Sequence, residues 1–315
     1  MRVITEAEAN SLITPALAFG AVKAAFIAAA DGSAVLGTLG RGTGTEPGTG
    51  FTIKSGHVKG VNVVGAKLGS YWSGNESRGL SCHNSTVLLL DPKTGEVAYL
   101  IEGRGLNGWR TAAADAVAAS VLARRNSRVL SIIGAGHQAY YEVRALCEIL
   151  SIEEVRVSSR TEASAWSLVE KLRPKVAAKL SACSIESACR AADVLVTTTS
   201  ATKPLFEDAW IKPGTHIAAM GTDRKGKQEI PLSLVRRAAL FADHPAQSRE
   251  IGEFQHIAAE IDAGSLSVVA IGHVLTGQSP GRTSDDQITL FDSSGIAPQD
   301  LLVAQRIVEA ASHRP

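Results

Sequence analysis

Short apolar runs alternate with helical stretches over the larger part of the chain, from residue 112 to residue 287. The stretch Thr111–Arg125 is rich in Ala and Val and predicts a long helix. The apolar runs that follow it predict strands at Val129–Ile133, Val155–Ser159, Val194–Thr198, His216–Met220 and Ala239–Ala242. Strands that alternate with helices form parallel sheets covered on both faces. The pattern therefore predicts an α/β fold with a Rossmann-type doubly wound parallel sheet over residues 112–287.

The N-terminal part of the chain mixes helix and strand signals. Thr14 and Pro15 supply a hydroxyl cap and a first-turn proline for an Ala-rich helix that ends before Gly32. Three further apolar runs predict strands, at Val61–Leu68, Ser85–Leu90 and Val97–Ile101, and a turn at Asp91–Gly95 joins the last two. The final stretch, Leu301–Ala311, predicts a helix that folds back on this part of the chain. We therefore predict a smaller mixed α+β domain, residues 1–111 and 288–315, for substrate binding and dimerisation.

Charge and composition exclude several classes of function. The 315 residues hold 32 Lys+Arg against 31 Asp+Glu, a formal charge of +1, which excludes a general nucleic-acid binder. Four cysteines without a CxxC pair, and scattered histidines, argue against a disulfide framework and against a metal site. No apolar run reaches the ~18 residues of a membrane helix, and Glu6 and Glu8 interrupt any apolar leader. We expect a cytoplasmic protein, with no membrane partner, that acts on a small molecule.

The most specific local motif is a glycine turn directly after the first strand of the predicted sheet. Its sequence is Gly134-Ala135-Gly136-His137-Gln138-Ala139, and a helix-forming segment follows. Gly134 allows a tight turn, Gly136 lets the backbone approach a pyrophosphate, and Ala139 lets the helix pack closely on the strand. Amides at the start of the helix then bind the phosphates. The motif predicts a dinucleotide site.

The end of the second strand determines which nicotinamide cofactor fits. NAD-binding domains usually carry an acidic residue there for the ribose hydroxyls. Here Ser159, Arg160 and Thr161 follow the strand instead, and the nearest acids, Glu153 and Glu154, precede it. An arginine with two hydroxyls suits a 2′-phosphate, so we predict NADPH as the cofactor, with NADH as the alternative.

Beyond the glycine turn, ordered blocks over nearly the whole chain resemble the ornithine cyclodeaminase/μ-crystallin family. The blocks are Lys67 to Asn75, Arg78 to Leu89, Asp91 to Gly95, Trp109 to Ala113, the glycine turn itself, Val194 to Pro204, His216 to Asp223 and Ile288 to Ala297. The joint order of the blocks is specific, although no single block is. The resemblance implies a nicotinamide-dependent enzyme of amino-acid metabolism that acts as a homodimer, with members that include cyclodeaminases, an alanine dehydrogenase and imino-acid reductases.

The resemblance also implies roles for individual residues. Lys67 and Arg110 match the cations that hold the substrate α-carboxylate, and Arg41 resembles a further arginine near the substrate. Asp223 matches an aspartate beside the substrate nitrogen, where a carboxylate stabilises an iminium or relays a proton. The remaining cofactor residues that the blocks imply, beside the glycine turn and residues 159–161, are Thr198, Thr199, Ser200, Met220, Gly221, Ser294 and Gly295. Because the predicted helix starts at Thr111, Arg110 lies at a helix N-terminus, where an anionic ligand explains a cation.

The sequence departs from the cyclodeaminase pattern at Lys54, where cyclodeaminases usually carry an acid. A lysine there repels the second amine of ornithine and favours a substrate with a second carboxylate, for which Lys54, His57 and His83 are candidates. The segments around Lys54 and Tyr71 also resemble those of iminosuccinate reductases. His83 is equally compatible with donation to a substrate oxygen and with a structural role.

Together these features predict an NAD(P)H-dependent reductase of a small α-imino acid, of the ketimine or iminosuccinate type, that gives an L-amino acid. Hydride passes to an imine carbon whose carboxylate is held by Lys67 and Arg110. Two alternatives remain: an ornithine or lysine cyclodeaminase with bound NAD, and a non-catalytic NADPH-binding protein like the crystallins. Retention of Lys67, Arg110 and Asp223 together argues against the second.

Overall fold

The computed structural model describes residues 1–313 and divides into two compact units. The first unit comprises residues 1–110 together with the described residues from Ile296 onward, and the second comprises Thr111–Gly295. The second unit thus extends past residue 287, where the sequence analysis placed its end, because residues 289–292 form a central strand of its sheet. The roles predicted for the two domains stay predictions at this point.

The first unit is built on a sheet with the strand order β1-β7-β6-β5-β4-β2, to which β3 adds by pairing with β4. Its elements are β1 (Arg2–Ile4), α1 (Glu6–Leu12), α2 (Pro15–Ala30), β2 (Ala34–Leu36), β3 (Gly40–Gly42), β4 (Thr49–Val58), η1 (Lys59–Val61), β5 (Val63–Trp72), η2 (Ser73–Arg78), β6 (His83–Leu90), β7 (Val97–Glu102) and α11 (Ala297–Ser312). Within residues 1–313, the β1–β7 pair of this sheet is parallel and its other pairs are antiparallel. The predicted mixed α+β architecture and the β6–β7 hairpin are confirmed.

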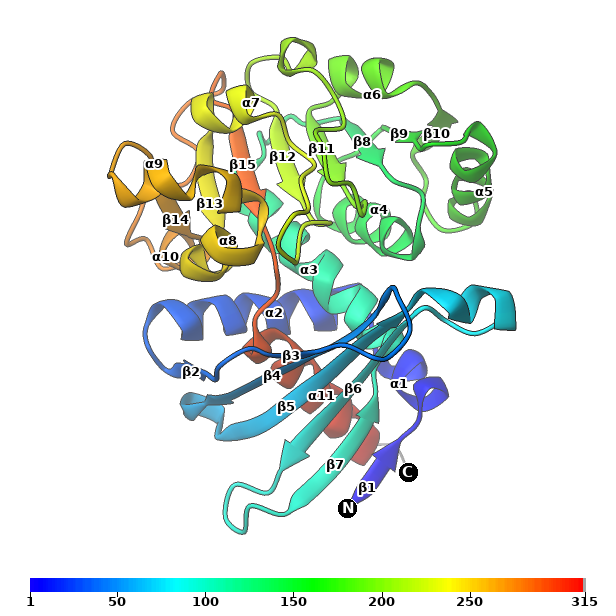
Figure 1. The fold of residues 1–315 in the computed structure, drawn as a ribbon, viewed down its shortest axis with the longest axis vertical. Coiled ribbons are helices and arrows are strands. Elements are labelled where there is room, and N and C mark those ends of the chain that lie inside the picture. Colours follow the sequence, from blue (N-terminus) through cyan, green and yellow to red (C-terminus); the bar gives the residue numbers. More distant parts are fainter. Residues whose placement is uncertain (314–315) are drawn as a thin grey trace. The chain divides into compact units, whose positions relative to one another are not determined.

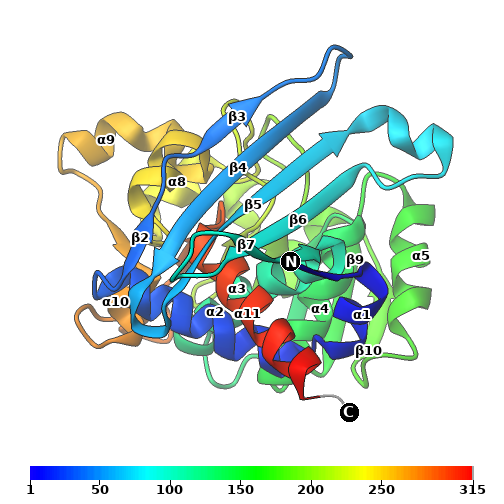
Figure 2. The ribbon, with the colours of Figure 1, turned by 90° about the horizontal axis from the view of Figure 1, so that it is seen from below.

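Two helices, α2 and α11, pack together in the first unit, and α11 also lies on β5 (Figure 2). Thr14 caps α2 as predicted, its Oγ1 accepting a hydrogen bond from the Leu17 amide at 3.1 Å. The helix α11 approaches the sheet closely at a glycine: a Cβ on Gly65 would lie 2.1 Å from the Leu88 carbonyl and 3.0 Å from Leu301 Cδ2. A larger residue at Gly65 would therefore push α11 away from β5.

The second unit contains a parallel sheet with the order β10-β9-β8-β11-β12-β15-β13-β14 (Figure 1). Its elements are α3 (Arg104–Leu122, which begins in the first unit), β8 (Val129–Ile133), α4 (His137–Ile149), β9 (Glu154–Ser158), α5 (Glu162–Leu172), β10 (Lys179–Ala182), α6 (Ile185–Ala191), β11 (Val194–Thr197), η3 (Asp208–Trp210), β12 (His216–Ala219), α7 (Leu232–Arg237), β13 (Ala239–Ala242), α8 (Pro245–Ile251), η4 (Glu253–Ile257), α9 (Ala258–Asp262), β14 (Val268–Ala270), α10 (Ile271–Leu275) and β15 (Thr289–Asp292). The strand order reverses direction between β8 and β11, which is the switch point of a doubly wound sheet. The predicted fold class is confirmed.

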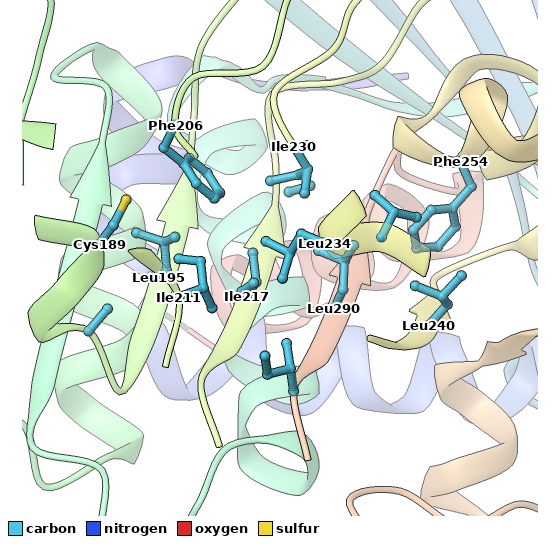
Figure 3. Close-up of a cluster of buried hydrophobic side chains, with 14 of the residues drawn as sticks. Cys189, Leu195, Phe206, Ile211, Ile217, Ile230, Leu234, Leu240, Phe254 and Leu290 are labelled. Atoms are coloured by element: carbon cyan, nitrogen blue, oxygen red, sulfur yellow. The ribbon is translucent and has the colours of Figure 1, made fainter. Parts of the chain in front are cut away.

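Apolar side chains of neighbouring strands form a continuous layer on one face of this sheet (Figure 3). Leu195, Ile217, Leu290 and Leu240 are cross-strand partners in register on β11, β12, β15 and β13. The strand residues of opposite parity, such as Val196, are fully buried as well. Burial of both faces explains why these strands read as continuous apolar runs in the sequence.

The predicted start of the long helix before the second sheet is wrong. The helix α3 begins at Arg104, seven residues before the predicted start at Thr111, so Arg110 lies in its second turn and not at its N-terminus. The dipole argument for an anion beside Arg110 therefore does not apply. In the second unit, the strands β10, β14 and β15 were not predicted as strands. Within residues 1–313, no single helix has the length and apolar character to cross a membrane, although the bent pair α1 and α2 passes the same test together.

Candidate active site

The glycine turn connects β8 to α4 in the second unit, as the motif predicts. Gly134 has a φ of 115°, and a Cβ there would lie 2.7 Å from Thr198 Oγ1, so only glycine fits. Gly136 is the N-cap of α4, and a Cβ on it would meet no atom within 4 Å. Open space thus lies beside the first turn of α4, and Gly136, having no side chain, supplies no side-chain cap to this helix.

The residues predicted to bind the dinucleotide follow the carboxyl ends of adjacent strands. They are Gly134 to Gln138 after β8, Ser159 to Thr161 after β9, Thr198 to Ser200 after β11, Met220 and Gly221 after β12, and Ser294 and Gly295 after β15. These strands are neighbours in the sheet, so their carboxyl ends form one edge, where open α/β sheets bind ligands. The fold therefore brings the predicted set together at the switch point.

A buried carboxylate, Glu229, fastens two of these loops to each other. Its Oε1 accepts from the amide and the hydroxyl of Thr199, at 2.6 and 2.7 Å. Its Oε2 accepts from Thr197 Oγ1 at 2.8 Å and from the Gly221 amide at 3.0 Å. A Cβ on Gly221 would lie 2.3 Å from the Thr199 carbonyl, so glycine allows this close approach. Burial raises the pKa of Glu229 to about 7, against the opposing effect of the hydrogen bonds from Thr199.

A second carboxylate, Glu253, supports the first. It accepts from Thr222 Oγ1 at 2.7 Å and from the amides of Glu229 and Ile230 at 3.1 and 2.8 Å. Burial raises the pKa of Glu253. The two acids accept from different donors, and Glu253 fixes the backbone at Glu229 by accepting from the amides of Glu229 and Ile230.

Asp243, at the end of β13, holds the loop after β15. Its Oδ2 accepts from Ser293 Oγ at 2.9 Å and from the Gly295 amide at 2.6 Å. Gln247 of α8 donates to Ser294 Oγ and to the Gly295 carbonyl, at 2.7 and 2.8 Å. The predicted residues Ser294 and Gly295 are thus fixed from two sides.

This edge of the sheet fits a dinucleotide. The hydroxyl of Thr198 is buried beside Gly134 and lacks a hydrogen-bond partner within the described residues. The start of α4 lies on the same edge, where Gly136 supplies no side-chain cap and a Cβ on it would meet no atom within 4 Å. A phosphate-bearing ligand supplies acceptors for such donors.

The loop after β9 carries no acidic side chain. Ser159 is half-buried and Arg160 is exposed. Thr161 caps α5, and its Oγ1 accepts from the Ser164 amide at 3.3 Å. Part of the reason for a hydroxyl at position 161 is therefore structural, whereas Arg160 extends from the loop without an ion pair among the described contacts.

A cluster of charged and polar side chains surrounds Lys67 of β5 in the first unit. Its Nζ donates to Asp300 Oδ1 of α11 at 2.9 Å and also to Asn107 Oδ1 of α3. Arg110 of α3 makes the same two contacts: its Nε lies 3.0 Å from Asp300 Oδ1, and its Nη2 lies 2.7 Å from Asn107 Oδ1. The predicted pair of cations is thus brought together, and both side chains are nearly buried.

Lys67 is poised to titrate near neutral pH. Burial lowers its pKa to about 7, and the positive charges of Arg110 and Lys54 act in the same direction. The negative charge of Asp300 opposes them. In turn, Lys67 and Arg110 hold the pKa of Asp300 below its ordinary value in spite of its burial. The cluster contains charges that an anionic ligand would stabilise further.

Strand register places two more predicted cations on the same face as Lys67. Lys54 of β4 is the direct cross-strand partner of Lys67, and Arg41 of β3 is the partner of Thr52, two residues from Lys54. Residues in register and residues two apart share a face of a sheet. Arg41, Lys54 and Lys67 therefore form a basic row across three strands.

The two candidate histidines lie on different faces of the sheet: His57 lies on the face opposite to that of Lys67, and His83, the partner of Tyr71, is on the same face as Lys67. His57 is the partner of Val64, an odd number of residues from Lys54, so it belongs to the opposite face and cannot share a ligand with Lys54. His83 is exposed and stacks near Tyr71, with ring centroids 4.7 Å apart. Tyr71 is four residues along β5 from Lys67, or about 13 Å of strand. The role of His83 in substrate binding stays a prediction.

Asp223 lies in the second unit, in the loop after β12. Its side chain is 59% exposed, and its Oδ1 contacts Lys227 Nζ at 2.8 Å. Lys227 also donates to the Gly221 carbonyl at 2.7 Å, which ties Asp223 to the loop that Glu229 fixes.

Sequence reasoning missed Asn107, Asp300, Glu229 and Glu253. Asp300 had a signal, because it is the one acid between Ile296 and Glu309, in an otherwise mainly apolar helix. A charge within an apolar helical segment indicates a buried partner. The other three lie in ordinary polar segments and had no such signal.

The sheet order and the glycine turn define the second unit as a Rossmann-type dinucleotide-binding fold, accompanied by a unit with a buried cationic cluster. Residues 51–314 match the model of the ornithine cyclodeaminase/mu-crystallin family, and the chain belongs to this family. The family resemblance predicted from the sequence is confirmed.

Three relatives illustrate the similarity. Iminosuccinate reductase of Paracoccus denitrificans is 38% identical over 314 residues, which cover 100% of this chain and 98% of the relative. Its structure with NAD+ has a TM-score of 0.92 and covers 99% of this chain and 97% of that one. The Δ1-pyrroline-2-carboxylate reductase of Thermococcus litoralis, with NADH and L-proline, is 26% identical with a TM-score of 0.93, covering 99% and 98%. An archaeal alanine dehydrogenase dimer with bound NAD is 33% identical with a TM-score of 0.91, covering 98% and 95%.

Proposed function

We propose that this protein reduces a small α-imino acid with a second carboxylate to the corresponding L-amino acid. The chain is an oxidoreductase that uses a nicotinamide cofactor, as the sequence predicted. The observation that supports the dicarboxylate is the pairing of Lys54 with Lys67 directly opposite each other on β4 and β5. Like charges in register destabilise a sheet, and a bound anion removes that cost. The relative with 38% identity is an iminosuccinate reductase, whose name specifies a dicarboxylic imine.

The α-carboxylate binds Lys67 and Arg110 in this proposal. The guanidinium of Arg110 suits a carboxylate because its planar donors match two oxygens. Asp300 and Asn107 already orient both cations, so little side-chain freedom is lost on binding. The second carboxylate binds Lys54, with Arg41 further along the basic row.

When bound, the reduced nicotinamide supplies a hydride for the imine carbon. Lys67 and Arg110 draw electron density toward the carboxylate and hold the carbon in place. Asp223 stabilises the positive charge of the protonated imine nitrogen and, being exposed, exchanges protons with water. Since Lys67 must be protonated to bind the carboxylate, kcat/KM falls as the pH rises above about 7.

The dinucleotide occupies the edge of the second sheet. The amides that follow Gly134 and Gly136 bind the pyrophosphate, with His137 and Gln138 beside them. Arg160, with Ser159 and Thr161, binds a 2′-phosphate, which makes NADPH the preferred cofactor and NADH the alternative. The loops after β11, β12 and β15 hold the nicotinamide end; their residues are Thr198, Thr199, Ser200, Met220, Gly221, Ser294 and Gly295.

A homodimer completes the proposal. Ile53 and Leu68 are cross-strand partners on the outer face of β4 and β5, and they are 42% and 45% exposed, with Phe51 beside them. Such an apolar group on a sheet face suits a second copy. Sedimentation should give a dimer for the parent protein and a monomer for Ile53→Asp; a monomeric parent would contradict this part.

Because all four cysteines are free thiols, we place the protein in the cytoplasm.

The test is the loss of absorbance at 340 nm, measured with NADPH and with NADH against a panel of imines. Oxaloacetate plus ammonium should turn over fastest, ahead of pyruvate plus ammonium and of five- and six-membered cyclic imino acids. Turnover restricted to cyclic imines would contradict the proposal that the substrate is a dicarboxylic imine. Release of ammonia from ornithine without net NADH formation would favour the cyclodeaminase, and silence with every substrate would favour the non-catalytic binder.

A further inference from the structure

We propose that Asp300 is a positioning residue that fixes the separation of Lys67 and Arg110 and favours the charged form of Lys67. The inference rests on the proposed function, because it assigns the cluster to substrate binding. It adds a group from the last helix of the chain, 233 residues from Lys67 in sequence.

The geometry is that of one oxygen shared by two cations. Asp300 Oδ1 lies 2.9 Å from Lys67 Nζ and 3.0 Å from Arg110 Nε. Asn107 Oδ1 also accepts from both side chains. Two acceptors that each contact the same two donors define the distance between those donors, although their like charges repel.

The second oxygen of Asp300 is unused. Oδ2 is buried and has no hydrogen-bond partner among the described residues. A buried carboxylate that served only the fold would be expected to satisfy both oxygens. Here the ion pairs of Asp300 are made with Lys67 and Arg110 through its other oxygen, Oδ1.

Two glycines of the sheet allow α11 to approach closely enough for the contact between Asp300 and Lys67. Gly65 lies two residues before Lys67 on the same face of β5, and a Cβ there would meet Leu301 Cδ2 at 3.0 Å. Gly56 of β4 is the partner of Gly65, and a Cβ on it would meet Ala297 Cβ at 3.3 Å. The glycine pair lets α11 sit close enough for the short side chain of Asp300 to reach Lys67.

The charges around Lys67 make Asp300 decisive for its protonation. Arg110 from α3 and Lys54 from β4 both lower the pKa of Lys67, in addition to its burial. Asp300 from α11 is the acid that raises it. Without that charge, the pKa of Lys67 falls further below its ordinary value, and the ammonium is lost at neutral pH.

The experiment compares the pH profile of kcat/KM for the parent protein and for Asp300→Asn, with oxaloacetate plus ammonium and saturating cofactor. The alkaline limb should move to lower pH by at least one unit, so that the loss at pH 8 exceeds the loss at pH 6 by about fivefold or more. Glu309→Gln removes a partly exposed acid, paired with Arg306, from the same helix and should leave the limb in place. An unshifted limb in Asp300→Asn would overturn the proposal.

A measurement independent of turnover separates this inference from the proposed function. Acetylation of Lys67 by acetic anhydride is followed by mass spectrometry at each pH, with the exposed Lys59 as reference. The limited access of the buried side chain scales the rate at every pH, so the pH of half-maximal labelling follows the protonation of Lys67. Asp300→Asn should shift the half-labelling pH downward whether or not the imine is reduced. If Asp300→Asn does not fold, Asn107→Asp tests the opposite sign, since a second carboxylate on the same two cations should shift both curves upward. No shift in that variant would contradict the inference.

Discussion

Lys54 and Lys67 are cross-strand partners on the same face of an antiparallel pair, and Lys67 is almost entirely buried. Two lysines in this relation repel each other unless an anion lies between or beside them. Asp300 neutralises part of the charge of the group that also contains Arg110. The remaining positive charge is what selects a doubly charged acidic substrate in the account above.

Replacing Lys54 by Gln should therefore weaken the dicarboxylic imine selectively. KM should rise about ten- to a hundredfold, the loss of one charge-assisted hydrogen bond, while turnover of a monocarboxylic imine stays within about twofold. Initial rates over a range of oxaloacetate and of pyruvate, each with ammonium, give the comparison. Lys59→Gln, an exposed lysine of the same unit, is the control. Equal losses with both substrates would show that Lys54 does not recognise the second carboxylate.

Glu229→Gln should loosen the loops at the end of β11 and β12. Glu229 accepts from Thr197, Thr199 and Gly221, and an amide nitrogen in place of one oxygen would face donors. We expect a stability loss of about 1–3 kcal/mol and an NADH Kd raised at least tenfold, read by denaturant unfolding and cofactor fluorescence. Glu207→Gln, exposed in the same unit, should change neither. An unchanged Kd would mean that these loops do not form the cofactor site.

Asp115 predicts a pH dependence of stability. It is fully buried, and burial raises its pKa to about 7 from an ordinary 3.8. The folded state therefore binds this proton more tightly than the unfolded state does. The stabilisation is complete below pH 3.8 and is lost as the pH rises through about 7. Between about pH 5 and 7, the Tm of the parent should fall by roughly 3 °C per pH unit more than that of Asp115→Asn. Parallel curves for the two proteins would contradict this.

Arg160→Gln should separate the two cofactors. If Arg160 binds the 2′-phosphate, kcat/KM for NADPH should fall about ten- to a hundredfold and that for NADH should remain within about twofold. Arg173→Gln, an exposed arginine after α5, is the matched control. A parent that prefers NADH, with no response to Arg160→Gln, would replace NADPH by NADH in the account.

The periodicity of the chain predicted most of the second sheet and the N-terminal helix α2, because buried parallel strands and capped helices leave local signals. The start of α3 has no local signal in the sequence. Residues Arg104 to Gly108 include two glycines and an asparagine, which disfavour helix. The helix starts there because Glu6, from α1, accepts from the amides of Arg104 and Gly105 at 3.0 and 2.7 Å. A cap supplied from nearly a hundred residues away is invisible to local patterns.

The site residues also divide into those with a local sequence signal and those fixed by residues distant in the chain. Lys67, Arg110 and the glycine turn were found from motifs. Asp300 and Asn107, which position the two cations, became apparent only when the fold joined the last helix to β5 and α3. Conversely, His57 seemed a partner for Lys54 by proximity in sequence, and the alternation of the strand places it on the other face.

The central claim is that an imine, and not a keto group, accepts the hydride to give an L-amino acid. The most direct test is to incubate the enzyme with oxaloacetate, 15N-ammonium and a reduced nicotinamide cofactor that carries two deuterium atoms at C4, and to analyse the product by mass spectrometry and chiral chromatography. The account predicts L-aspartate that carries one 15N and one deuterium on Cα. Deuterated malate without nitrogen, or aspartate without deuterium, would contradict it.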